Sequence, residues 1–130
     1  MKQLIIWQCA AILFGIFEGI LFHLNNKLTP KFKERFGFDI HIVFGFIRLC
    51  LFFPLIITVE NRIIFAMISM FTFPFLHDGF YYFTRNLLNP KIYKKSFFDD
   101  SVTSTAVLSL GVFYRIILFV FGMGLIFVLW

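Results

Sequence analysis

Charged side chains are scarce in this sequence. They make up only 15% of the 130 residues, whereas hydrophobic side chains make up 60%, and the mean hydropathy is +0.88. A soluble domain of this length cannot bury so much apolar surface, because small proteins have a high surface-to-volume ratio. The composition therefore excludes an ordinary soluble domain and predicts a membrane protein. Phe alone supplies 22 residues, which we interpret as lipid-facing and packing bulk.

The sequence also lacks the local motifs that are typical of disulfide-rich proteins, metal sites, nucleotide-binding sites and common hydrolases. Cys9 and Cys50 lie in apolar runs without paired spacing, so neither a disulfide framework nor a zinc ribbon is predicted. A P-loop, a dinucleotide fingerprint, a nucleophile elbow and the H-E-x-x-H pattern are all absent from the printed sequence. The first apolar run follows one Lys and contains no A-x-A site. We therefore expect a retained helix rather than a cleaved signal.

Four long apolar runs dominate what is present. Each reaches the ~20 residues that a helix needs to span ~30 Å of hydrocarbon. The runs are Leu4–Leu24, Ile40–Val59, Ile63–Phe83 and Ser104–Trp130. They predict an all-α, polytopic integral membrane protein, with residues 1–130 forming one four-transmembrane-helix bundle. In size and helix count the chain is similar to small four-helix multidrug transporters and small fluoride channels, and this similarity is one of architecture only.

Basic residues gather in the two longer connections between these runs, and the net charge is +5. The first connection contains Lys27, Lys31, Lys33 and Arg35, and the second contains Arg85, Lys91, Lys94 and Lys95. The positive-inside rule predicts that both connections are cytoplasmic and that both termini lie on the other side. We expect these loops to contact anionic lipid headgroups or a partner protein, and we expect no nucleic-acid binding.

Small residues recur at helical spacing in two of the runs. Ala11, Gly15 and Gly19 follow one another every four residues, and Gly111 and Gly122 fall near one face of the last run. Such spacing lets helix backbones approach closely in lipid. We interpret these residues mainly as packing positions that could support a homo-oligomer. The alternative is that the face of the first helix lines a narrow polar path.

Ionisable residues inside the apolar runs are the candidate functional site. They are Glu18, His23, His41, Arg48, His77, Asp78 and Arg115. A rise of about 1.5 Å per residue places all seven in one half of the bilayer, with the two arginines deepest. Charges inside a membrane are costly and usually face protein or water. The sequence therefore predicts one polar layer near the cytoplasmic side.

Three functions fit such a layer. The leading hypothesis is a homo-oligomeric channel without a cofactor or enzymatic activity, in which Glu18, Asp78 and the histidines line a vestibule and the arginines set selectivity or lock the structure. A membrane-embedded, metal-dependent lipid hydrolase is the second hypothesis, with candidate ligands Glu18, His23, His41, His77 and Asp78. The third hypothesis is a membrane-anchored regulator that docks a cytoplasmic protein. Simple ion pairing that holds the bundle together is the structural alternative to all three.

Two local features complete the expectations. Pro74 lies inside the third run and should bend its helix. Asp99, Asp100 and Ser101 precede the fourth run and should cap its helix.

Overall fold

The computed structural model describes residues 1–25, 40–99 and 110–129, although the side chains of Asn25, Ile40 and His41 are not among the described groups. Within these ranges the chain forms four helices and no strand. They are α1 (Lys2–Asn25), α3 (Ile40–Ile57), α4 (Arg62–Leu88) and α5 (Val112–Leu129). The prediction of an all-α fold with four helices is confirmed.

Three of these helices are long and apolar enough to cross a membrane: α1, α4 and α5. The remaining helix, α3, contributes a shorter apolar stretch, Ile42–Ile57. Three candidate spans support the membrane class that the composition predicts. That α3 also crosses, and which side the loops face, stay predictions.

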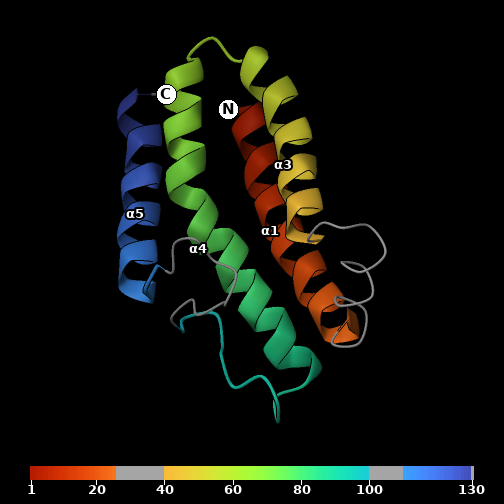
Figure 1. Cartoon of the computed structure of the whole chain (residues 1–130). Coiled ribbons are helices and arrows are strands. Elements are labelled where there is room, and N and C mark those ends of the chain that lie inside the picture. The colour runs from red at the N-terminus through yellow and green to blue at the C-terminus, as the bar shows by residue number, and fades with distance from the viewer. Residues whose placement is uncertain (26–39, 100–109, 130) are drawn as a thin grey trace.

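Helix α4 is the central element of the bundle. It packs extensively against α1 on one side and α5 on the other, whereas α3 touches α1 and α4 only lightly. Figure 1 shows the N-terminus, the α3–α4 turn and the C-terminal end of α5 at one end of the molecule. The segment that follows α4 lies at the opposite end. Sequential described helices therefore alternate in direction.

Small residues of α1 permit its close approach to α4. Ala11 is fully buried, and a Cβ added to Gly15 would collide with the backbone carbonyl of His77. A Cβ on Gly19 would lie 2.9 Å from the carbonyl oxygen of Tyr81. The stripe of small residues thus serves a contact within the chain. It is occupied by α4, so this face does not supply the contact between copies that the spacing suggested.

The apolar core lies near the end of the molecule that holds the N-terminus and the α3–α4 turn. Leu4 and Trp7 of α1 pack there with Phe65 and Ile68 of α4. Phe52 of α3 joins this core, because its ring centroid lies 4.9 Å from that of Trp7 and 5.6 Å from that of Phe65. Leu51, Leu55 and Ile56 of α3 also pack against this core, so both aromatic and aliphatic side chains attach α3.

Helix α5 meets α4 through another glycine. A Cβ on Gly122 would lie 2.9 Å from Cγ2 of Thr72 and 3.1 Å from Cβ of Phe71. Beside this contact the rings of Phe71 and Phe121 meet edge to face, with centroids 5.2 Å apart. Gly111, in contrast, precedes α5, where its carbonyl accepts a hydrogen bond from the backbone N–H of Arg115.

The start of α5 differs from the prediction. The helix begins at Val112 rather than Ser104, and Leu110 and Gly111 just before it are not helical. Asp100 and Ser101 lie outside the described residues, and Asp99 does not cap this helix. The Asp99 carboxylate instead accepts a hydrogen bond from the backbone N–H of Ser96. The sequence concealed this start because Leu110 continues the apolar run, although it is not helical.

The centre of α4 contains Pro74. Figure 1 shows α4 changing direction near its middle, which is the bend expected where a proline removes a backbone hydrogen bond. The half of α4 beyond this point carries His77 and Asp78 toward α1 and α3.

Candidate functional site

Four ionisable side chains from three helices form one connected group, which we call the charged cluster: Glu18, Arg48, His77 and Asp78. Arg48 of α3 donates from Nη2 to Glu18 Oε1 of α1 and also to His77 Nε2 of α4, the latter over 2.8 Å. His77 Nδ1 lies 2.9 Å from Asp78 Oδ1. His77 Nε2 also lies 3.5 Å from Glu18 Oε2. The cluster therefore joins α1, α3 and α4.

The hydrogen bonds assign the tautomer of His77. A guanidinium has only donors, so His77 Nε2 must accept the hydrogen bond from Arg48. The ring proton then resides on Nδ1, from which it is donated to Asp78 Oδ1. One positive charge thus stands between two carboxylates and a neutral imidazole.

The cluster is buried on one side and open on the other. The side chains of Glu18 and His77 are 8% and 10% exposed, whereas those of Arg48 and Asp78 are 24% and 31% exposed. At about 1.5 Å per residue, Glu18 lies about 10 Å and Arg48 about 12 Å from the loop-side ends of their helices. His77 lies about 16 Å from the end of α4 by the same rise. Glu18 and His77 thus lie well inside two candidate spans, and Arg48 of α3 lies beside them.

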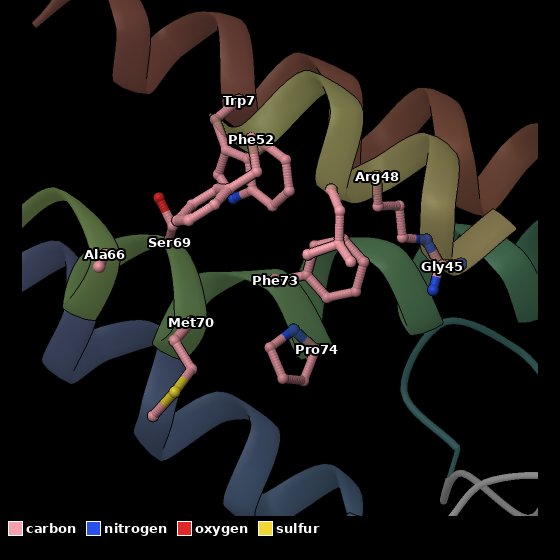
Figure 2. Close-up of a pocket in the computed structure, with 10 residues that line it drawn as sticks. Trp7, Gly45, Arg48, Phe52, Ala66, Ser69, Met70, Phe73 and Pro74 are labelled. Carbon is pink, nitrogen blue, oxygen red and sulfur yellow. The ribbon is translucent and has the colours of Figure 1, made fainter. Parts of the chain in front are cut away.

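Arg48 also lines a cavity of about 680 Å³ between α3 and α4. The other lining residues are almost all apolar: Trp7, Gly45, Leu49, Phe52, Ala66, Ser69, Met70, Phe73 and Pro74. Figure 2 shows Phe52 and Arg48 extending from α3 toward α4, with Phe73 between them. A Cβ on Gly45 would meet nothing within 4 Å. Arg48 therefore has open space beside it.

His23, another predicted member of the polar layer, lies apart from this cluster. The His23 ring meets the Tyr93 ring edge to face at 6.0 Å, and its buried Nδ1 has no hydrogen-bond partner among the described residues. The side chain of His41 lies outside the described residues. None of the contacts in the described part of the chain joins either histidine to the cluster.

Arg115 lies near the start of α5 rather than deep in the bilayer, because α5 begins only three residues earlier. Its side chain is fully buried and Nη2 donates to the backbone carbonyl of Asp99. Arg115 thus ties α5 to the segment that follows α4. Of the two arginines expected in the polar layer, only Arg48 pairs there with an acid, Glu18.

The geometry bears directly on the metal hypothesis. Among the described residues, no group of three or more His, Cys, Asp or Glu side chains could hold a metal ion. His77 turns its two nitrogens toward different carboxylates, so Glu18 and Asp78 approach opposite edges of the ring. With His23 apart, the described members of the predicted ligand set do not converge.

The basic connections are described only in part. Lys27, Lys31, Lys33 and Arg35 lie outside the described residues. Arg85, which the sequence placed in the second connection, lies in α4, because this helix continues to Leu88, and it is held among aromatic rings. In the connection itself, Lys95 Nζ lies 5.7 Å from the Tyr82 ring centroid, and Lys91 and Lys94 are exposed.

Two polar contacts were missed by the sequence reasoning. Gln8 Nε2 donates to Thr72 Oγ1 over 2.6 Å, and Thr72 Oγ1 donates to the carbonyl of Ile68 over 2.8 Å. A Gln inside an apolar run was the available signal, since a buried amide needs a partner. These bonds link α1 to α4 at the end of the bundle away from the charged cluster.

No protein-family model, curated protein or solved structure matches this chain. The function is therefore argued from the charged cluster itself.

Proposed function

We propose that this small helical protein is a channel-type membrane transport protein that moves protons through the charged cluster. The observation that carries the proposal is the position of His77, whose two ring nitrogens face carboxylates from two helices. A histidine can accept a proton at one nitrogen and release one from the other. Glu18, His77 and Asp78 therefore supply a donor, a relay and an acceptor in sequence.

The proton transfers balance without any cofactor. Protonated Glu18 transfers its proton to His77 Nε2, and the imidazolium releases its Nδ1 proton to Asp78. The distances that these steps bridge are 3.5 Å and 2.9 Å. These two transfers leave the ring with its proton on Nε2. The ring must then reorient so that an unprotonated nitrogen faces Glu18 before the next proton can enter.

Arg48 blocks this path while it is hydrogen-bonded to His77. While Arg48 donates to His77 Nε2, that nitrogen cannot take a proton, and a fixed positive charge in a pore repels protons. The cavity of about 680 Å³ beside Arg48 provides space for the guanidinium to turn away. Helix α3, which carries Arg48 and packs lightly, is the element that would move.

Assembly as a homo-oligomer is part of this proposal. About a quarter of the Arg48 side chain and nearly a third of the Asp78 side chain are exposed in the single chain. Charged groups that face lipid are costly. A second copy against α3 and α4 would cover them and complete the wall of the path.

Proton flux into liposomes tests the proposal. The purified protein is reconstituted with an internal pH dye, and flux is driven by a potassium gradient with valinomycin. Glu18→Gln and Asp78→Asn should each reduce flux at least tenfold, whereas Glu60→Gln, which alters an exposed acid in the α3–α4 turn, should leave it unchanged. Native mass spectrometry of the same samples reports assembly. Unchanged flux and assembly in both cluster variants would sink the proposal.

A further inference from the structure

A second polar site lies at the far end of α4 from the α3–α4 turn. Its cavity of about 210 Å³ is lined by Tyr82 and Arg85 of α4 and by Ile92, Tyr93, Lys94 and Lys95 of the segment that follows. Figure 1 shows this segment folding beneath the end of α4. At about 30 Å³ per water, the cavity holds about seven water molecules. It suits a compact polar group rather than an acyl chain.

We propose that this cavity binds a phosphate group, as presented by an anionic phospholipid headgroup. Three cationic side chains line it, namely Arg85, Lys94 and Lys95, and none of the carboxylates in the described part of the chain does. A guanidinium binds phosphate oxygens through its planar fork, and lysines add point charges around them. This cavity shares no residue with the charged cluster, so the proposal of phosphate binding is independent of the proposal of proton transport.

The position of Arg85 is fixed before any ligand arrives. Its guanidinium carbon lies 3.8 Å from the Phe22 ring centroid, 4.4 Å from that of Tyr93 and 5.1 Å from that of Tyr81. Its Nη1 donates to the Tyr81 hydroxyl over 3.0 Å. Contacts of a cation with aromatic faces are favourable, especially when desolvated. Arg85 therefore loses little conformational freedom when it binds a ligand.

Arg85 also retains donor capacity. Its Nε is buried and has no hydrogen-bond partner among the described residues. A buried donor without a partner costs free energy, and a phosphate oxygen at the guanidinium edge would satisfy it. This is the observation that distinguishes the cavity from a merely basic surface.

The segment after α4 is fastened so that its lysines stay at the cavity. Asn86 Nδ2 donates to the Tyr93 carbonyl over 2.8 Å, and the Tyr93 N–H donates to the Asn89 carbonyl over 2.9 Å. These bonds hold residues 89–93 against the end of α4. Lys94 and Lys95 follow at once, so their backbone position is set by the same turn.

The nearest described acid on this segment has its own partners. Hydrogen bonds from the backbone and the side chain of Ser96 hold the pKa of the Asp99 carboxylate below its usual range, and the charges of Lys95 and Arg115 lower it further. Asp99 does not line the cavity. The Asp99 charge therefore offsets the positive charge around the cavity only in part. Arg85 and Lys94 still line the cavity.

A lipid is the favoured source of the phosphate. Arg85 lies three residues before the end of α4, one of the candidate spans. Tyrosines and basic residues near the end of a span lie at headgroup level. The cavity is thus expected where phospholipid phosphates are most concentrated.

Native mass spectrometry of the full chain in mild detergent tests the site with phosphatidylglycerol as the probe. Lys94→Gln should weaken retention of phosphatidylglycerol about fivefold, and the Lys94→Gln/Lys95→Gln pair about twentyfold, from the usual contribution of a lysine near anionic lipid. Lys91→Gln is the matched control, because Lys91 is exposed on the same segment but does not line the cavity. It should weaken retention less than about twofold. Arg85→Gln is assayed alongside circular dichroism, since it also removes the contacts with three rings.

Three outcomes are informative. Selective loss with the lining lysines supports a phospholipid site. Displacement of the lipid by inorganic phosphate at equal potency supports the phosphate site but assigns it to free phosphate. Equal losses for Lys91→Gln and Lys94→Gln, or no retention of either probe, would overturn the proposal, because charge at the surface would then explain the binding.

Discussion

The contacts that α4 makes with α1 and with α3 differ in kind. Against α1, glycines bring backbone close to backbone, and a single added Cβ at Gly15 finds no room. Against α3, the contacts are aromatic rings, a few aliphatic side chains and Arg48, and a Cβ at Gly45 would meet open space. Helices α1, α4 and α5 thus form a closely packed frame, to which α3 is attached through side chains and charge.

This difference assigns different tasks to the two regions. Dense packing in lipid gains van der Waals contacts over a large area and resists movement. A helix held by one arginine and a few apolar side chains beside a cavity can shift at lower cost. The frame therefore fixes Glu18, His77 and Asp78, while α3 positions the guanidinium that hydrogen-bonds to Glu18 and His77.

The largest expected loss of stability comes from disturbing the close contact between α1 and α4. Gly15→Ala should destabilise the protein by about 3 kcal/mol, because the new Cβ collides with the His77 carbonyl and forces α1 away from α4. Reversible unfolding in mixed micelles measures the change. Gly124→Ala is the control, since a Cβ there meets nothing within 4 Å. Equal stability of Gly15→Ala and wild type would contradict the close packing.

A smaller loss is expected where α3 is attached through charge. Glu18→Gln and Arg48→Gln should each cost about 2 kcal/mol, more than the ~0.6 kcal/mol typical of hydrogen bonds between membrane helices and less than the ~3 kcal/mol at the low end for breaking a buried ion pair. The double variant should cost clearly less than the sum, because the two residues share one contact. Strict additivity in unfolding measurements would show that they do not interact.

The smallest expected effect is at Gly45 of α3, where the packing is open. Gly45→Ala should stabilise the protein by up to about 1 kcal/mol, since alanine favours a helix over glycine and the site has room. The same unfolding assay detects it. A loss of stability there would mean that α3 packs as closely on its neighbours as α1 does on α4.

Much of the frame followed from the sequence. Apolar runs predicted four helices, and the spacing of Ala11, Gly15 and Gly19 predicted a close helix contact. Spacing could not tell which helix would occupy that face, because a stripe of small residues fits a neighbour in the same chain or in another. The contact is internal, with α4.

Part of the site was predictable from the positions of the charged residues along the runs. These positions placed Glu18, Arg48, His77 and Asp78 in one half of the bilayer, with Arg48 deeper than the others, and the four side chains form one connected group. Arg115 was assigned a deeper position because the last run was counted from Ser104, whereas α5 begins at Val112. The cavity beside Arg48 had no sequence signal, since it depends on how far α3 stands from α4.

The most direct test of the central claim is proton flux through reconstituted His77→Gln protein. His77 is the relay between Glu18 and Asp78, so His77→Gln should reduce flux at least tenfold with assembly intact. His23→Gln makes the same change at a histidine outside the cluster and should leave flux unchanged. Equal flux through wild type and His77→Gln, or equal losses for both histidine variants, would contradict the assignment of the proton path to the charged cluster.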